Sequence, residues 1–522
     1  MLESGSNAYP REVTTDITSP AAQTPAASDK LDKRVLLPAG VVVLAAIMSI
    51  LDITVVSVAL RTFQGAFHKT SAQVAWTMTG YTLALATVIP LTGWAADRFG
   101  TKRLFMLAIV LFTLGSAMCS TADSLELLVT YRVLQGLGGG MLMPLGMTIL
   151  TRAAGPERVG RVMAVLGIPM LLGPIFGPIL GGWLIDIASW HWIFLINVPI
   201  GAIAVAYSWF VLEKDEVSPS ETFDFVGMLL LSPGLATLLY GVSSIPAAKQ
   251  EHGTMWTGQV ITFIVIGVVL TLAFVPWALR KKNIHPLVDL RLFLHKEITI
   301  AVLAMMVFAI AFFGATLLFP LYFQNVHGQT PLNSGWWLAP QGVGAMVTMP
   351  IAGVLADRIG PGKVVLTGLA LDTVGMGFFA FTNATTGYAP YMLGGLVIMG
   401  LGMGATMMPI MSAALAKLDE HSIARGSTLM NVTQQVASSV GTALFSVLLV
   451  NAFQTHPSIA AVAKAGKAAT PAQIHQSLTD MGDAFASVFV IATILVACCF
   501  IPAVFLPRTK EAGGSVPMPI GH

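Results

Sequence analysis

The chain has 522 residues, of which 55% are hydrophobic and 10% are charged. Because a soluble domain carries about 25% charged residues, this composition excludes a soluble globular protein and indicates a polytopic membrane protein. The formal net charge of +2 gives no reason to expect a nucleic-acid partner. The three cysteines, Cys119, Cys498 and Cys499, lie in apolar segments, so neither a disulfide framework nor a metal site is predicted.

The N-terminal tail, residues 1–35, is polar and rich in Ser, Thr, Pro and Ala, which predicts disorder. It contains no apolar region typical of a signal peptide. Apolar runs long enough to cross a bilayer as helices follow it. We expect fourteen, at about 36–60, 74–95, 103–122, 126–150, 162–184, 192–212, 226–245, 257–279, 298–323, 334–355, 364–383, 389–416, 424–450 and 485–506.

An even number of spans places both termini on one side of the bilayer. Most of the 28 Lys and Arg residues fall on that side, so both termini are predicted to be cytoplasmic and the protein to lie in the cytoplasmic (inner) membrane. Longer loops are expected near 280–297 and 451–484, the latter with an Ala-rich surface helix.

An internal repeat divides the chain. Gly93-Trp-Ala-Ala-Asp-Arg-Phe-Gly100 recurs as Gly353-Val-Leu-Ala-Asp-Arg-Ile-Gly360, 260 residues later. Duplicated halves related by an axis along the membrane normal are typical of transporters that rock around a central site. We therefore predict an all-α fold with these parts: a first six-helix bundle at 36–212, two intervening helices with their loops at 213–297, a second bundle at 298–506 and a tail at 507–522.

Asp52 is the first candidate functional residue. It lies in Leu51-Asp-Ile-Thr-Val-Val-Ser-Val-Ala-Leu60, inside an almost wholly apolar span. A charged side chain at the centre of a spanning helix costs roughly 2.5–3.5 kcal/mol on insertion scales, so such a residue usually faces the protein interior or a water-filled path.

Arg132 and Gln135 lie three residues apart in the fourth span and share one helix face. An unpaired guanidinium in hydrocarbon is very unfavourable. We expect Arg132 to meet Asp52, a water-filled cavity or carbonyl groups of a neighbouring helix; snorkelling to the interface is the alternative. The second half has no Arg at the equivalent place, near Leu396, so the proton chemistry is predicted in the first half.

The repeated turn predicts a conformational latch on the cytoplasmic side. Its glycines permit a tight turn, and Asp97 is expected to cap a helix or to pair with Arg98 or Arg103. An ordinary charged turn is the alternative, which the repetition disfavours. The residues of the predicted latch are Asp97, Arg98, Arg103, Asp357 and Arg358.

The fifth span has glycines at every fourth position, Gly173, Gly177 and Gly181, which predicts close packing against another helix. Pro174 and Pro178 alternate with them and remove backbone donors, so the helix is expected to bend.

These segments resemble the signature motifs of the major facilitator superfamily, and the Gly-Pro pattern resembles that of its drug:proton antiporters. With fourteen spans, of which the seventh and eighth lie between two six-helix bundles, the chain resembles the fourteen-span drug:proton antiporter-2 family. Further matching segments are Trp190-His-Trp-Ile-Phe-Leu-Ile-Asn-Val-Pro-Ile-Gly201 and Pro320-Leu-Tyr-Phe-Gln324. His191 departs from the Arg usual in the family, and Arg61 from a common Pro. The resemblance implies that Asp52 and Arg132 couple transport to protons and that Asp97 belongs to a latch.

The substrate cavity is predicted from polar and aromatic residues of the spans, which are equally typical of contacts between helices. Asp372, in the eleventh span, is either a site for a cation or a second proton, or a structural hydrogen-bond partner. The candidate lining residues are Gln135, Phe308, Tyr322, Gln341, Asp372, Asn431 and Gln434.

The predicted function is a proton-coupled antiporter that exports amphipathic drugs or toxic compounds by alternating access. The alternative is an exporter of a dedicated lipid, siderophore or metabolite. An enzyme is not predicted, because the chain lacks His-Glu-x-x-His, a phosphate-binding loop and a nucleophile elbow. No cofactor or metal is expected. The expected partners are protons, a small-molecule substrate and the bilayer, and the sequence identifies no periplasmic adaptor.

Overall fold

The computed structural model describes residues 33–508, with the exception of 70, 75, 156–157, 159–161, 163–164, 166, 168–172, 174–175, 178, 186, 215–222, 281–282, 284–285, 416–417, 419 and 466–468. The predicted tails at 1–35 and 507–522 therefore lie almost entirely outside the described residues.

Helices account for nearly all of the regular structure in the described residues. In the first half they are α1 (Lys33–Phe67), α2 (Ser71–Val74), α3 (Trp76–Val88), α4 (Leu91–Phe99), α5 (Thr101–Cys119), α6 (Leu125–Ala154), α8 (Trp192–Leu195) and α9 (Asn197–Val211). Two helices intervene, α10 (Phe225–His252) and α11 (Gly258–Ala278). The second half contains η2 (Leu290–Leu294), α12 (Lys296–Thr316), α13 (Leu318–Asn325), α14 (Pro331–Ile359), α15 (Pro361–Ala380), η3 (Tyr388–Met392), α16 (Leu393–Leu415), α17 (Glu420–Gln454), α18 (Pro457–Ala465), α19 (Pro471–Cys498) and α20 (Phe500–Ala503).

Twelve helical stretches in the described residues are long and apolar enough to cross a membrane. The predicted second span is divided into α3 and α4 beside Pro90, which has no backbone N–H to continue the helical hydrogen bonds. About half of the predicted fifth span lies outside the described residues. The fourteen-span count therefore stays a prediction.

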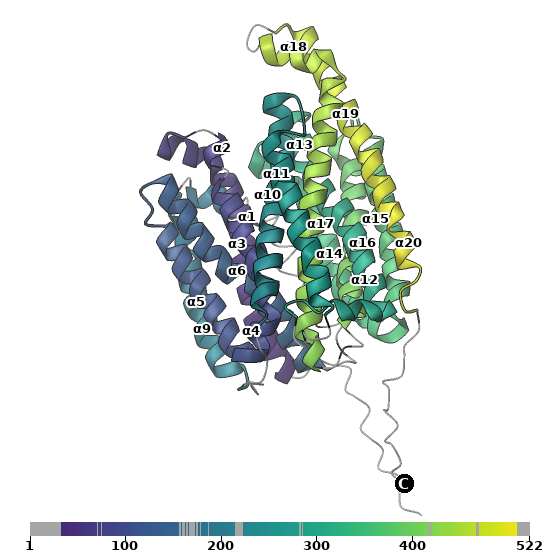
Figure 1. The fold of residues 1–522 in the computed structure, drawn as a ribbon. Helices are drawn as coiled ribbons and strands as arrows, with labels where there is room; N and C mark the ends of the chain where they lie inside the picture. Colours follow the sequence, from purple (N-terminus) through teal and green to yellow (C-terminus); the bar gives the residue numbers. More distant parts are fainter. Residues whose placement is uncertain are drawn as a thin grey trace, which may run out of the picture.

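The helices run roughly side by side, and the first described residues of α1 lie at the same end of the bundle as α20 (Figure 1). We call this end the termini side and the other end the opposite side. On the opposite side α18 and the first turns of α19 project beyond the other helices (Figure 1). The Ala-rich surface helix predicted near 451–484 is thus present as α18.

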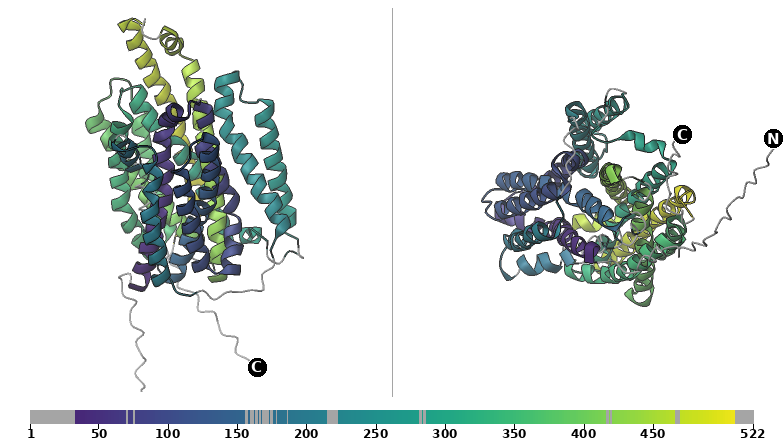
Figure 2. Two further views of the ribbon diagram at one scale, coloured as in Figure 1. Left: turned by 90° about the vertical axis from the view of Figure 1, so that its left-hand side faces the viewer. Right: turned by 90° about the horizontal axis from the view of Figure 1, so that it is seen from below.

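Viewed along the bundle, α1–α9 gather in one group and α12–α20 in another, while α10 and α11 lie at the periphery between them (Figure 2). Helix α10 contacts α3 of the first group and α17 of the second. Trp76 of α3 stacks on Tyr240 of α10, with ring centroids 5.5 Å apart. The first intervening helix, α10, is therefore packed against both halves, whereas α11 packs on α10.

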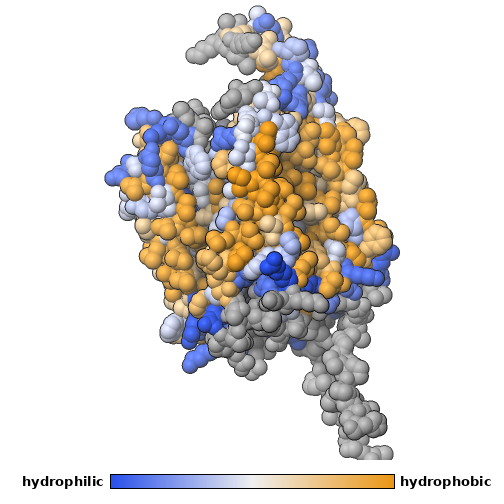
Figure 3. Space-filling view, in the orientation of Figure 1, coloured by the Kyte–Doolittle hydropathy of each residue, from blue (hydrophilic) through white to orange (hydrophobic). Residues whose placement is uncertain are grey.

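The surface is apolar around the middle of the bundle and hydrophilic towards both ends (Figure 3). Many large apolar side chains are exposed, among them Phe210, Leu272 and Val347. A contiguous exposed apolar surface of this kind is expected where lipid, rather than water, surrounds the protein.

The internal repeat is visible in backbone geometry. Gly100, between α4 and α5, has φ 91° and ψ 141°, and Gly360, between α14 and α15, has φ 93° and ψ 140°. Each glycine N–H donates to the carbonyl of the alanine four residues earlier, Ala96 or Ala356. Because residues with a side chain rarely adopt this positive φ, glycine is required at both turns.

Candidate functional site: a buried ion pair and a closure between the halves

Asp52 and Arg132 form an ion pair inside the first half. Asp52 lies on α1 and is 2% exposed, and Arg132 lies on α6 and is 1% exposed. Arg132 Nη1 donates to Asp52 Oδ2 at 2.5 Å. Of the partners expected for Arg132, the structure thus places Asp52 in contact with it, and the guanidinium does not reach the membrane interface.

In the hydrogen bonds that the structure gives to the Asp52 carboxyl, the carboxyl oxygens accept and side-chain N–H groups donate. Besides Arg132, Gln135 Nε2 donates to Asp52 Oδ1 at 2.8 Å, and Asn197 Nδ2 donates to the same oxygen over a longer 3.4 Å. An ionised carboxylate is an acceptor only, whereas a protonated one carries a donor. The arrangement therefore fits Asp52 in its ionised form.

Arg132 is held on its other sides as well. Its Nε donates to Thr77 O at 3.1 Å and its Nη1 to Gln135 Oε1 at 2.8 Å. The Tyr81 ring lies 4.2 Å from the guanidinium carbon, within the range of a cation–π interaction. The guanidinium can consequently stay in place while Asp52 changes its partners.

A cluster of buried apolar residues in the first half lies towards the opposite side from the ion pair. It includes Val55, Val56, Phe63, Trp190 and Phe194, all buried. Two charges enclosed in this way are stable only with close pairing and further hydrogen bonds, and breaking such a pair by removing one partner costs about 3–5 kcal/mol. The site is therefore sensitive to the protonation state of Asp52.

The glycines of the fifth span place α1 beside this site. A Cβ at Gly173 would meet Ile50, one at Gly177 would meet Thr54, and one at Gly181 would meet Val55. These α1 residues flank Asp52 in sequence, so the glycines allow the close approach predicted for this span. Pro174 and Pro178 lie outside the described residues.

The two halves meet on the termini side through α17. Asp97 of α4 has Arg425 Nε of α17 3.8 Å from its Oδ2 and Arg152 Nη2 of α6 3.9 Å from its Oδ1. Arg425 Nη1 also lies 3.8 Å from Oδ2 of Asp289, which caps η2 after the intervening helices. One arginine thus links α4, α17 and the segment preceding the second half.

Polar contacts between α6 and α17 continue this closure. The hydroxyls of Thr148 and Ser427 lie 3.2 Å apart, and Ser427 Oγ also donates to Pro144 O at 3.2 Å. Asn431 Nδ2 lies 3.1 Å from the sulfur of Met147. The halves are therefore joined between the Asp52 site and the termini side of the bundle.

The remaining predicted latch residues lie at the repeated turns. Arg98 and Arg103 flank Gly100 on α4 and α5, while Asp357 and Arg358 end α14 before Gly360. The ion-pair partners of Asp97 at Arg152 and Arg425 were not among the partners expected from the sequence.

The predicted cavity residues divide into two sets. Phe308 and Tyr322 are fully buried, Phe308 stacking on Phe312 and Tyr322 donating its hydroxyl to Asn383 O at 3.0 Å. Gln135 belongs to the Asp52 site. Only part of the prediction therefore concerns side chains with some exposure in this conformation, namely Gln341, Asn431 and Gln434.

Asp372 is 1% exposed and lies where α15 packs on α16. Thr406 Oγ1 donates to its Oδ2 at 3.3 Å, and a Cβ at Gly402 would touch its carboxyl carbon. Its Oδ1 has no hydrogen-bond donor within the described part of the chain. Both interpretations of Asp372, a site for a cation or a second proton and a structural hydrogen-bond partner, therefore stay predictions.

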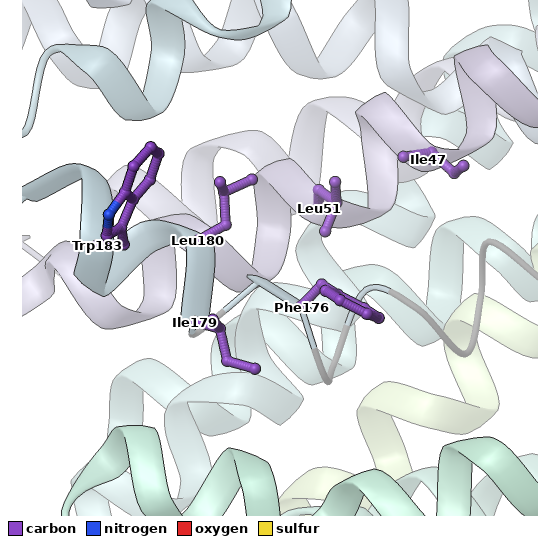
Figure 4. A pocket seen from close by; sticks show the side chains of 6 residues that line it. All are labelled: Ile47, Leu51, Phe176, Ile179, Leu180 and Trp183. Carbon is purple, nitrogen blue, oxygen red and sulfur yellow. The ribbon is translucent and has the colours of Figure 1, made fainter.

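A wholly apolar pocket of about 380 Å³ lies between α1 and the fifth span (Figure 4). Its lining residues are Ile47, Leu51, Phe176, Ile179, Leu180 and Trp183. Asp52 is the neighbour of Leu51 in sequence but its carboxyl is directed to α6, so the pocket carries none of the ion-pair chemistry.

Sequence reasoning missed several residues of the site. Asn197 and Ser116 join the Asp52 network through a 3.1 Å hydrogen bond between them. The available signal was a polar side chain in an apolar span, and Asn197 also lies in the segment Trp190–Gly201 that resembles the family. For Arg425 the signal was a faint repeat, Arg425-Gly426 against Arg158-Val-Gly160, which indicated no partner, and Asp289 gave no signal.

A duplicated helical bundle with a buried ion pair and contacts that close one end between the halves is typical of membrane transporters. The sequence profile of the Major Facilitator Superfamily matches residues 42–442. The chain belongs to this superfamily.

Two relatives are similar to the chain in sequence, and two solved structures are similar to it in fold. It is 51% identical to the "Multidrug resistance protein B homolog" of Mycobacterium tuberculosis, covering 94% of this chain and 93% of the relative. It is 31% identical to "Multidrug export protein EmrB" of Escherichia coli, covering 79% and 80%. The human organic anion transporter MFSD10 and the proton:xylose symporter XylE each give a TM-score of 0.57 at 14% identity. The alignments cover 89% of this chain and all of MFSD10, and 91% of this chain and 96% of XylE, and they establish the fold alone.

Proposed function

We propose that the protein is a proton-coupled antiporter that exports amphipathic drugs or toxic compounds across the cytoplasmic membrane, with the termini side facing the cytoplasm. The names of the two relatives support drug export, and their alignments cover most of each chain. The finer placement in the fourteen-span drug:proton antiporter-2 family belongs to this proposal.

The observation that carries proton coupling is the buried pair of Asp52 and Arg132. A nearby positive charge favours the ionised carboxylate, whereas burial favours the neutral acid. Opening the site to water on alternate sides of the membrane changes both influences. A proton taken up by Asp52 from outside would weaken its hold on Arg132, and substrate binding in the other conformation would favour proton release. Exchange of substrate for protons follows from this competition.

The conformation described here is closed on the termini side. Contacts of α17 with α4 and α6, including the Asp97–Arg425 pair, hold the halves together there. In the proposed cycle this is the state in which substrate has been released outward and Asp52 awaits a proton. Opening towards the cytoplasm requires these contacts to separate.

The test is transport by reconstituted protein in vesicles with an acidic lumen and a neutral exterior. Wild type should accumulate a fluorescent amphipathic dye, ethidium, only while the gradient persists, because protons leaving the lumen drive uptake. Asp52→Asn should abolish gradient-driven uptake, since an amide does not titrate. Asp123→Asn is the matched control, because Asp123 is an exposed residue of a loop on the opposite side.

Dye uptake indifferent to the gradient would refute proton coupling. Unchanged uptake by Asp52→Asn would refute the role of Asp52 while leaving export intact. Because removing one partner of a buried pair is destabilising, the variants are compared only after gel filtration shows a folded, monodisperse protein, and Asp52→Glu serves as a second variant that keeps a titratable carboxyl.

A further inference from the structure

We propose that Asn197 is a positioning residue for the proton-coupling carboxyl: its side-chain amide donates to ionised Asp52 and, after turning over, accepts a hydrogen bond from protonated Asp52. The inference rests on the proposed function, in which Asp52 takes up and releases a proton. It adds a residue of α9 to a site whose ion pair comes from α1 and α6.

Asn197 is the first residue of α9 and is 3% exposed. Its two amide hydrogens have two acceptors: Asp52 Oδ1 at 3.4 Å and Ser116 Oγ at 3.1 Å. Its own Oδ1 receives no hydrogen bond from the residues that the structure describes. The amide thus presents its donor end to the carboxylate and keeps its acceptor end unused.

A proton on Asp52 would face donors in the present arrangement. Arg132, Gln135 and Asn197 all direct N–H groups at the carboxyl, so a carboxylic O–H needs an acceptor in their place. Arg132 has no acceptor atom. Gln135 is held by both ends, because its Oε1 accepts from Arg132 Nη1 at 2.8 Å while its Nε2 donates to Asp52 Oδ1 at 2.8 Å.

Asn197 is the neighbour that can reverse its direction. A half-turn about its terminal torsion exchanges Nδ2 for Oδ1 without moving α9, and such torsions have broad, roughly two-fold preferences. Turning Gln135 would instead point an NH₂ group at Arg132. The acceptor for protonated Asp52 is therefore the Asn197 carbonyl oxygen.

Ser116 sets the resting direction of the amide. Its hydroxyl donates to Phe194 O at 2.9 Å, so its oxygen is left to accept from Asn197 Nδ2. When the amide turns, the Ser116 hydroxyl must leave Phe194 O to donate to Asn197 Oδ1. Protonation of Asp52 consequently breaks the hydrogen bond to Phe194 O in α8, the short helix before α9.

The titratable groups around Asp52 are few in the described residues. Arg132 of α6 is the charged neighbour, and Tyr81 of α3 and Cys119 of α5 are close enough to interact electrostatically with both members of the pair. Asn197 and Ser116 do not titrate themselves. Their effect on Asp52 must therefore appear as a changed proton affinity or a changed hydrogen bond of the acid.

The test is infrared spectroscopy of the full-length protein in lipid, following the carbonyl stretch of protonated Asp52 against pH, with the Asp52→Asn spectrum in each background subtracted. In Asn197→Leu the protonated acid loses its acceptor, so its band should move to higher frequency. In Asn197→Asp a second carboxylate disfavours ionisation of the first, so the pair should bind its first proton with at least about tenfold higher affinity.

Two further variants keep the proposal decidable. Ser116→Ala removes the group that orients the amide and should raise the proton affinity of Asp52 by less than Asn197→Asp does. If the Asn197 variants do not fold, Ser116→Ala alone tests the proposed role of Asn197. Asn451→Leu, at an exposed position of α17, should leave band and midpoint as in wild type.

An Asp52 band at the wild-type frequency in Asn197→Leu, or an unchanged midpoint in Ser116→Ala, would overturn the inference. Because these spectra need neither substrate nor gradient, they separate this inference from the proposed function. A shifted band with gradient-independent transport would retain the Asn197 role and reject coupling. Coupled transport with unshifted spectra would retain coupling and reject the Asn197 role.

Discussion

The glycine contacts of the fifth span predict a graded series of packing defects next to the buried pair of Asp52 and Arg132. In Gly177→Ala the new Cβ would lie 2.5 Å from Thr54 Cβ and closer still to Thr54 Oγ1. Thr54 cannot turn away at no cost, because its hydroxyl donates to Leu51 O at 2.9 Å. The clash must therefore displace α1, which carries Asp52 two residues earlier.

The three positions differ in the size of the clash. In Gly181→Ala the nearest atom is Val55 Cγ1 at 3.0 Å, which a small shift relieves, and in Gly182→Ala nothing lies within 4 Å. Overpacking a filled site costs typically about 1–3 kcal/mol. We expect Gly177→Ala to fall within that range, Gly181→Ala below it, and Gly182→Ala to match wild type.

The assay combines thermal unfolding in detergent with gradient-driven dye uptake. Because a protein of this size need not unfold in one step, the rank order of midpoints is compared rather than a free energy. Gly177→Ala should lose the most stability and uptake, and adding Thr54→Gly should restore part of both by removing the clashing atoms. Equal damage from Gly182→Ala, or none from Gly177→Ala, would refute the packing argument.

Two further predictions concern the ends of the bundle. Arg425→Gln removes the charge between Asp97 and Asp289, so the termini side should open more often; in a background lacking native cysteines, Ser427→Cys should then react faster with a thiol reagent, and an unchanged rate would contradict the closure. On the opposite side, burial lowers the pKa of His327 below its usual value. The unfolded chain then binds the proton more readily, so stability should fall as pH drops through about 6.5. His327→Gln should reduce this fall in unfolding midpoint between pH 7.5 and 5, whereas the exposed His475→Gln should not; equal pH dependence in wild type and His327→Gln would exclude the contribution of His327.

The features most accessible from sequence were those with a local cause. A repeated Gly-x-x-x-Asp-Arg-x-Gly requires a tight turn in both halves, and Gly100 and Gly360 have almost the same backbone angles. The stripe of glycines in the fifth span likewise has one physical use, which is close approach of a second helix, here α1.

The features that required the structure depend on contacts between distant segments. Asp52 and Arg132 were both anomalous in apolar spans, but neither residue indicates that their side chains meet. Asn197 adds a donor from a third helix, and its proximity depends on how α9 packs on α1. Arg425 pairs with Asp97 across the two halves, a contact that exists in this conformation and that no local pattern encodes.

The predicted cavity shows why residue type alone is a poor guide to exposure in a membrane protein. Phe308, Tyr322 and Asp372 were selected as polar or aromatic side chains of central spans, yet all three are buried between helices. In a bilayer, aromatic and polar groups serve contacts between helices as readily as they serve a substrate. Which side of a helix faces a cavity is decided by packing.

Helix α6 connects the two functional ends of the first half. Arg132 near its beginning binds Asp52, Thr148 contacts Ser427 of α17, and Arg152 in its last turn lies near Asp97. Pro144 lies within the helix between them: it has no N–H, and its carbonyl accepts from both Thr148 and Ser427. The helix therefore lacks one of its own hydrogen bonds at the point where it is bonded to the second half. Because the same helix carries Arg132, it links the buried ion pair to the closure on the termini side.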